Sequence, residues 1–190
     1  LPKSFYPGMF DADRIVAQAK SAGMKYIVQV AKHHNGFCMW NSEFTDFDMS
    51  ATPFKRDIIG EMAAACEKAG LKYGIYYSQR DWHHPDYGPE RMAKYNEYMR
   101  NQIRELLVRH PNISIVWFDS GGYPFELWEG DALYRMIHGL RPDIIIGGRG
   151  WAHWWDFHRE EVPPVLRAEI EHECARLALV KLQIKELEAA

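Results

Sequence analysis

Several features that define other protein classes are scarce in this chain of 190 residues. No stretch approaches about 18 consecutive apolar residues, so we expect no transmembrane helix and no membrane partner. The net charge of −3 argues against a nucleic-acid partner, because phosphate binding depends mainly on Lys and Arg. The three cysteines (Cys38, Cys66 and Cys174) have neither disulfide nor metal-ligand spacing. With Leu1 in first place and no signal peptide, the chain is expected to begin partway into a longer protein.

What the chain has in quantity is apolar and aromatic residues. Its composition, 47% hydrophobic and 26% charged, is typical of a soluble globular protein with one substantial core. Aromatic residues make up 14% of the chain. Large rings usually fill a core, and they can also stack on the apolar faces of a sugar. Composition alone favours the first role.

A short repeat organises the first half of the chain. Ala22-Gly23-Met24-Lys25-Tyr26 recurs as Ala69-Gly70-Leu71-Lys72-Tyr73, and each copy follows a segment with helical apolar spacing. Asp11 and Asp57 open these two segments and can cap a helix N-terminus. The glycine suits the left-handed position after a helix, where the chain turns into a strand. The repeat therefore predicts two helix–strand units.

Strands and helices then alternate along the chain. The predicted strands are Lys25–Val30, Lys72–Tyr77, Ile113–Asp119 and Asp143–Gly147. The predicted helices of the second half are Pro89–Arg109 and Asp131–Leu140. This order indicates an α/β protein with a parallel sheet. Because a complete (β/α)8 barrel takes about 250 residues, four strands predict either a partial (β/α)8 TIM-like barrel or a small open sheet.

The third strand is the most informative segment, because an apolar, β-branched run stops abruptly at Asp119. Such runs are typical of strands buried on both faces. Barrels and open α/β sheets place their chemistry at the C-terminal ends of these strands. Period-two alternation puts Trp117 and Asp119 on one face. Asp119 is therefore either a catalytic carboxylate or an ordinary strand terminator.

Two adjacent histidines, His33 and His34, follow the first strand. Neighbours on an extended segment point to opposite sides, so we do not expect them to ligate one ion. No nearby carboxylate at ligand spacing supports zinc, and we predict no metal site. Neutral histidine offers a donor and an acceptor. Hydrogen bonding to a hydroxyl-rich ligand and a buried structural role are about equally favoured.

Charged groups also follow the fourth strand. Arg149 could orient a substrate, hold a catalytic carboxylate ionised, or form a structural ion pair. Glu160 and Glu161 lie on a predicted loop further along. Retaining glycoside hydrolysis requires two carboxyl groups, and loops after different strands can supply them. Without further support, this charge run is a solvated loop.

Further support comes from an ordered set of motifs. In chain order these are Lys32-His33-His34-Asn35-Gly36-Phe37, Lys55-Arg56-Asp57, Gly74-Ile75-Tyr76-Tyr77-Ser78 and Trp117-Phe118-Asp119. Together with Arg149 and Trp155-Asp156-Phe157, the set closely resembles glycoside hydrolase family 29, the α-L-fucosidases, as far as about Glu161. The resemblance implies a retaining hydrolase on a (β/α)8-like barrel. It would remove terminal α-L-fucose from oligosaccharides or glycoprotein glycans and would need no cofactor.

The resemblance also implies residue roles. Asp119 matches the nucleophile, and Glu161 is preferred to Glu160 as the acid/base. The residues expected to line the sugar pocket are His33, His34, Trp40, Tyr76, Trp117 and Arg149. Family members are commonly secreted, periplasmic or lysosomal, whereas the lack of a signal peptide leaves the localisation of this chain open.

The end of the chain departs from the family pattern. After Pro163-Pro164, apolar residues of Val165–Ala190 follow a 3-4 spacing, as in a coiled-coil seam or an amphipathic helix. We therefore predict a partial barrel over 1–162 and a C-terminal helix over 163–190, grafted or forming a homo-oligomer. We expect the strands that begin and close the family barrel to lie outside these 190 residues. An active fucosidase fragment, an inactive fucose-binding remnant and an assembly module all remain open.

Overall fold

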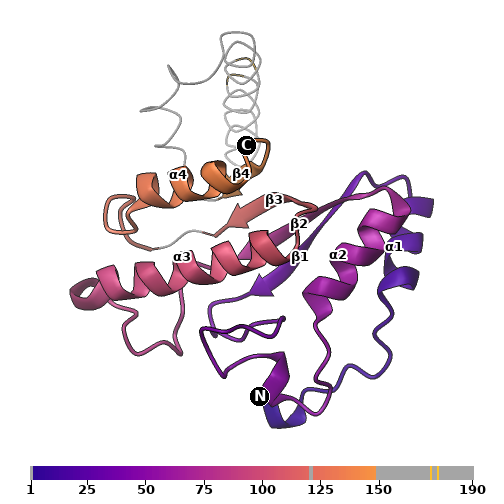
Figure 1. Ribbon diagram of the computed structural model, residues 1–190, viewed down its shortest axis with the longest axis horizontal. Coiled ribbons are helices and arrows are strands. Elements are labelled where there is room, and N and C mark those ends of the chain that lie inside the picture. The colour runs from indigo at the N-terminus through magenta and orange to yellow at the C-terminus, as the bar shows by residue number, and fades with distance from the viewer. Residues whose placement is uncertain (1, 120–121, 149–171, 173–174, 176–190) are drawn as a thin grey trace, which may run out of the picture. The chain divides into compact units, whose positions relative to one another are not determined.

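The computed structural model describes residues 2–119 and 122–148, together with His172 and Ala175 (Figure 1). Leu1–Gly150 forms one compact unit, and the contacts reported below lie within it. Of the predicted C-terminal helix only His172 and Ala175 are described, and both are helical and exposed. The helix as a whole and the division at residue 162 stay predictions. In the described part, no helix is long and apolar enough to span a membrane.

The centre of the unit is a parallel four-stranded sheet in the order β1-β2-β3-β4. The strands are β1 (Tyr26–Lys32), β2 (Lys72–Tyr77), β3 (Ile113–Phe118) and β4 (Ile145–Gly148). The predicted α/β class with parallel strands is confirmed. Each strand pairs with the next in the chain, as in a barrel, but over the described residues the sheet is open. The closed barrel is not seen there.

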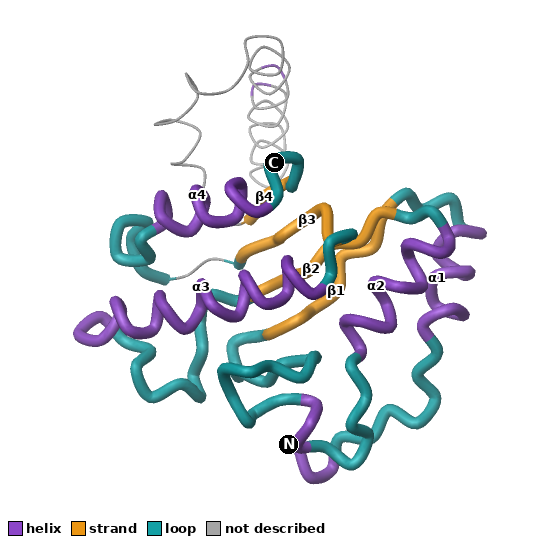
Figure 2. The backbone as a smooth tube through the Cα atoms, viewed as in Figure 1, coloured by secondary structure: helices purple, strands orange, loops and turns teal. Residues whose placement is uncertain are grey.

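Helices connect the strands, and the first two each begin at a capping aspartate (Figure 2). They are α1 (Ala12–Ser21), α2 (Ile58–Ala69), α3 (Met92–Arg109) and α4 (Gly130–Leu140), with short 3-10 helices η1 (Pro2–Ser4), η2 (Met49–Ala51) and η3 (Pro89–Arg91). The Asp11 carboxylate accepts a hydrogen bond from the Arg14 amide, and Asp57 accepts one from Gly60. Gly70 ends α2 in the left-handed conformation, with φ at 71°. The two predicted helix–strand units are thus present.

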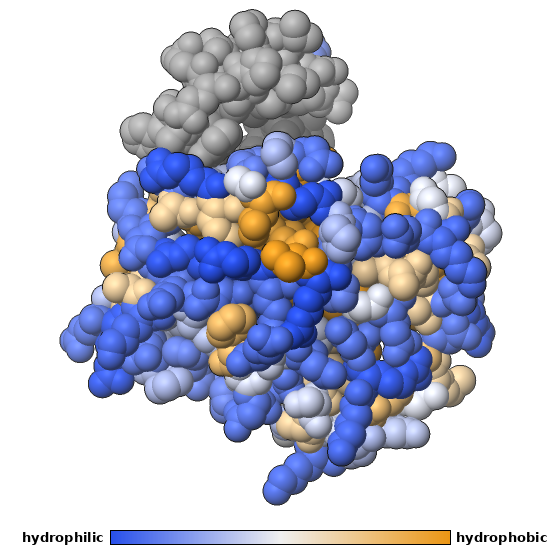
Figure 3. All heavy atoms as spheres, viewed as in Figure 1, coloured by the Kyte–Doolittle hydropathy of each residue, from blue (hydrophilic) through white to orange (hydrophobic). Residues whose placement is uncertain are grey.

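The two faces of the sheet differ sharply in exposure. Ile75, Val116 and Phe118 on one face are completely buried. On the other face, Val30 is 43% exposed and Trp117 is 42% exposed. A barrel fills this second face with layers of side chains from its other strands. The visible surface in Figure 3 is mostly hydrophilic, with an apolar patch near the end of α3.

Candidate active site

Predicted site residues from three strands meet at the carboxyl ends of the sheet. His33 and His34 follow β1, and Asp119 follows β3. Tyr76 lies near the end of β2, where it pairs with Trp117 across the sheet. Since side chains alternate along a strand, Tyr76, Trp117 and Asp119 share one face. This edge of the sheet is where α/β folds place their ligands.

Asp119 is held by its neighbours. The Tyr76 hydroxyl donates a 2.5 Å hydrogen bond to Asp119 Oδ2. His34 Nε2 lies 3.7 Å from the same oxygen, and the Asp119 side chain is 20% exposed. Hydrogen bonds to ionised groups are stronger than neutral ones. The carboxylate is thus oriented by protein groups while part of it stays open to a ligand.

The two histidines lie side by side, which corrects the sequence interpretation. Their ring centroids are 4.4 Å apart, and His33 stacks on Tyr76 at 5.6 Å. The prediction that they point to opposite sides was wrong, because β1 ends at Lys32 and the chain turns. The turn is closed by the Gly36 amide, which donates to the His33 carbonyl, and Gly36 has a φ of 80°.

Ser78 determines which nitrogen of His34 carries the proton. The Ser78 hydroxyl donates its only proton to the Arg80 carbonyl at 3.0 Å. The 2.5 Å contact with His34 Nδ1 must therefore be donation from the ring N–H to Ser78. Burial, together with His33 and Arg80, lowers the pKa of His34 despite Asp119. Neutral His34 consequently presents a lone pair on Nε2 on the side of Asp119.

A buried ion pair supports the loops that carry these groups. Lys32 Nζ lies 2.9 Å from Asp81 Oδ2, and both side chains are almost fully buried. Asp81 Oδ1 accepts hydrogen bonds from the His83 and His84 amides. Burial lowers the pKa of Lys32, although Asp81 opposes this effect. The pair joins the end of β1 to the loop after β2, and sequence reasoning gave it no role.

Not every residue predicted for the pocket reaches it. Trp40 is completely buried, and its indole N–H donates to Glu105 Oε2 at 2.8 Å. Its assignment to the sugar pocket is corrected: it packs in the core beside α3. Trp82, which was not predicted, lies edge-on to His34 with ring centroids 5.3 Å apart. Arg149, Glu160 and Glu161 lie outside the described residues.

Two further arrangements bear on ligand binding. The ligand atoms of His33, His34 and Asp119 all lie within 4.8 Å of one another, close enough for a metal ion.

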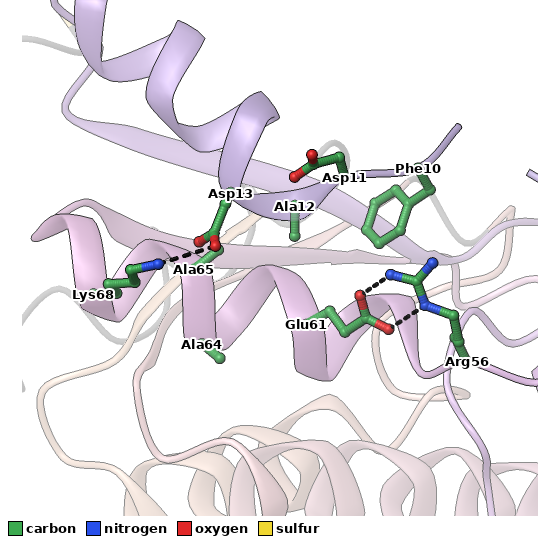
Figure 4. Close-up of a pocket in the computed structure, with 9 residues that line it drawn as sticks. All are labelled: Phe10, Asp11, Ala12, Asp13, Arg56, Glu61, Ala64, Ala65 and Lys68. Carbon is green, nitrogen blue, oxygen red and sulfur yellow. Dashed lines mark hydrogen bonds and ion pairs between the residues drawn. The ribbon is translucent and has the colours of Figure 1, made fainter. Parts of the chain in front are cut away.

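A separate pocket lies between the start of α1 and α2 (Figure 4). There Lys68 pairs with Asp13, and Arg56 pairs with Glu61. Four of its charged groups are already in ion pairs and Asp11 caps α1, so it is a weaker candidate than the strand ends.

Comparison with known proteins decides the family. The α-L-fucosidase family model matches residues 1–153. The chain belongs to the α-L-fucosidase family. The mouse (Mus musculus) tissue α-L-fucosidase is 36% identical over 155 residues, which cover 76% of this chain and 34% of the mouse protein.

Solved α-L-fucosidases share the fold. Isoenzyme 1 from Paenibacillus thiaminolyticus is 37% identical, with a TM-score of 0.71, over 76% of this chain and 39% of that one. A Bacteroides thetaiotaomicron enzyme, trapped as a covalent intermediate with 2-fluoro-fucosyl fluoride, is 32% identical. It has a TM-score of 0.71 over 76% of this chain and 36% of that one. The chain thus spans between about a third and two fifths of the length of these three fucosidases.

Proposed function

We propose that this chain carries the nucleophile and part of the sugar pocket of a retaining α-L-fucosidase, which removes terminal α-L-fucose from oligosaccharides or glycoprotein glycans. The observation that supports this best is Asp119 itself. It stands at the carboxyl end of β3, hydrogen-bonded by Tyr76 and beside His34. Family membership makes fucoside hydrolysis the natural chemistry for such a carboxylate.

The proposed reaction has two displacements. The Asp119 carboxylate attacks the anomeric carbon, and the bond to the glycosidic oxygen breaks as Glu161 protonates that oxygen. Glu161 then takes a proton from water, which attacks the same carbon and releases Asp119 and fucose. The covalent intermediate trapped in the Bacteroides thetaiotaomicron relative supports this route.

The remaining groups would bind and orient the sugar. His34 presents Nε2 as an acceptor for a sugar hydroxyl, and His33 lies beside it. The Trp117 ring, 42% exposed, offers an apolar surface to the C–H groups of the sugar. Arg149 would contribute a further polar contact. Tyr76 fixes the carboxylate through its hydrogen bond.

The test uses a nitrophenyl α-L-fucoside with the wild type, Asp119→Ala and Asp119→Asn. We expect nitrophenol release by the wild type only. Azide added to Asp119→Ala should restore nitrophenol release and give an inverted fucosyl azide, since a small anion can replace a missing nucleophile. Labelling with 2-fluoro-fucosyl fluoride should add one sugar mass to the peptide that contains Asp119. Full activity in Asp119→Ala would contradict the proposal.

An inactive fucose-binding remnant is the second candidate, and the open sheet face favours it. Val30, Trp117 and Ile145 are 42–62% exposed on the face that a barrel would fill. A well-folded wild type that binds fucose in calorimetry without turnover would establish this alternative. Light scattering on the same sample tests the third possibility, in which the C-terminal helix forms a homo-oligomer. A monomer would exclude it.

A further inference from the structure

We propose that His33, His34 and Asp119 form a binding site for a divalent first-row transition ion, in which Ser78 holds His34 in the ligating tautomer. The ligand atoms of the three residues lie within 4.8 Å of one another, and His34 Nε2 is 3.7 Å from Asp119 Oδ2. Around a tetrahedral ion with bonds of about 2.0–2.2 Å, ligand atoms lie roughly 3.3–3.6 Å apart. Side-chain movements of about 1 Å would therefore close the site, and His33 is an exposed residue.

The surrounding hydrogen bonds are those of a metal site. His34 donates Nδ1–H to Ser78, so its Nε2 lone pair is available on the side of Asp119. Metal-ligating histidines usually donate their second ring N–H in this way, and ligating carboxylates also accept outer hydrogen bonds. Asp119 accepts such a bond from Tyr76. His34 Nε2 and Asp119 Oδ2 are both electron-pair donors, and at 3.7 Å apart both could bind one cation.

The donor set selects the kind of ion. Two imidazole nitrogens and one carboxylate suit Zn²⁺, Co²⁺ or Ni²⁺, whereas Ca²⁺ and Mg²⁺ require more oxygen ligands. The positive charge of Arg80 is close enough to lower the pKa of His34, so it also opposes a bound cation. Affinity must then come from direct bonds to the nitrogens rather than from net charge. This again favours a transition ion.

The test is calorimetric titration of the 190-residue chain with ZnCl₂ in the absence of sugar. We expect one zinc ion to bind per chain, at a site formed by His33, His34 and Asp119. The variants His33→Ala, His34→Ala and Asp119→Asn should each bind zinc at least tenfold more weakly. Ser78→Ala should lose about 10–100-fold, because it removes only the outer hydrogen bond. His138→Gln, in α4 and outside the cluster, is the matched control and should bind like the wild type.

Two measurements keep the outcome interpretable. Co²⁺ should give the visible absorption of a tetrahedral nitrogen–oxygen site in the wild type, and His34→Ala should abolish it. His33 is exposed, so His33→Ala should fold normally, which thermal unfolding monitors. Zinc affinity that is equal in the wild type, His33→Ala and His34→Ala would overturn the proposal.

Competition with the sugar is a consequence that rests on the proposed function. An ion on Asp119 covers the nucleophile, so Zn²⁺ should inhibit nitrophenyl fucoside hydrolysis competitively, and chelator should reverse the inhibition. Zinc binding without any turnover would leave the metal site standing and count against the enzyme. If saturating zinc left turnover unaffected, the ion and the fucoside would not compete for Asp119.

Discussion

Two pairs of a basic side chain with a carboxylate stand at the ends of neighbouring strands, and they differ in almost every physical respect. Lys32 and Asp81 are 2.9 Å apart and almost fully buried. His34 and Asp119 are 3.7 Å apart, with 16% and 20% of their side chains exposed. In the first pair, both members make further hydrogen bonds: Lys32 donates to the Tyr95 hydroxyl, and Asp81 accepts from two backbone amides. The second is more widely spaced, and both of its side chains are partly exposed.

The surroundings explain the difference. Lys32 Nζ lies 4.6 Å from the centroid of the Tyr77 ring and 5.5 Å from that of Tyr95, and the Tyr95 hydroxyl also accepts a hydrogen bond from it. Such cation–π contacts help to offset the cost of burying an ammonium group. His34 has Ser78 on one nitrogen and Asp119 near the other. The Lys32–Asp81 pair therefore supports the loops of the candidate site, and the His34–Asp119 pair lies within it.

The largest expected effect is a loss of activity when the His34–Asp119 pair, called the open pair below, is changed. Asp119→Asn keeps the shape of the side chain but removes the proposed nucleophile, so fucoside hydrolysis should fall by about 10⁴-fold or more. The free energy of unfolding should change by less than about 1 kcal/mol, since the group is partly exposed. Steady-state kinetics and urea unfolding measure the two effects. If Asp119→Asn lowered both the activity and the free energy of unfolding, the open pair would not differ from the buried pair in the way expected here.

The next largest effect is on stability at the buried pair. Lys32→Met leaves the Asp81 carboxylate buried without its cation, which should cost about 3–5 kcal/mol of unfolding free energy. Lys68→Met is the matched control, because the Lys68–Asp13 pair is exposed and should contribute about 0–1 kcal/mol. Denaturant unfolding of both variants decides the matter. Equal stability losses would mean that Lys32 has no special structural role.

Gly36 closes the turn that follows β1 and lies against the Asp81 side chain, which gives a third test. Its φ is 80°, and a Cβ there would collide with the Asp81 carboxylate, so Gly36→Ala should destabilise the protein by about 2–4 kcal/mol. Gly23 has the same φ of 80° with open space around it. Gly23→Ala should therefore cost only the backbone term of about 1–2 kcal/mol. Thermal unfolding should show the difference, and equal costs would remove the steric argument.

Tyr76→Phe should sharpen the contrast at the open pair. It removes one hydrogen bond to an ionised carboxylate, which corresponds to about 1.5–3 kcal/mol, or roughly 10–100-fold in rate. We expect kcat to fall more than KM rises, because Tyr76 orients the nucleophile. Tyr73→Phe, which removes a hydroxyl bonded to Gln29 on the opposite face, is the control for activity. It should leave the rate unchanged.

The smallest expected effect is a pH dependence of stability. Burial lowers the pKa of His34, so the unfolded chain takes up more protons than the folded one as pH falls through about 6.5. The contribution of His34 is thus present above that pH and is lost below it. His34→Gln should flatten the fall in unfolding free energy between neutral and acidic pH. An unchanged slope would assign the fall to His84 and His110, whose pKa values burial also lowers.

Local patterns predicted most of the elements. The boundaries of β2 and the end of α3 agree with the predictions, and β3 stops directly before Asp119. By contrast, β1 runs two residues past the predicted end at Val30, because Lys32 pairs with Tyr77 of β2 and its side chain meets Asp81. Partners that are 45 or more residues apart leave no periodic trace in the sequence.

The site was predicted in part. Motifs and strand alternation pointed to His34, Tyr76 and Asp119, which the structure brings together. Trp40 was misassigned because a motif places a residue near a strand end without showing the direction of its side chain. Ser78 was quoted only as part of a motif, although its position two residues after Tyr76 at a strand end was a usable signal.

By itself, the sequence determined the helix–strand alternation, the parallel sheet and the carboxylate at the end of β3, because apolar period, capping and glycine positions act over a few residues. Only the tertiary structure decided that the two adjacent histidines lie on one side and that Trp40 belongs to the core. It also decided that the Lys32–Asp81 pair is buried, whereas the His34–Asp119 pair is partly exposed. These outcomes depend on burial and hydrogen-bond partners brought together from distant segments. Their energies arise from removal of water and from geometry, which exist only once the chain has folded.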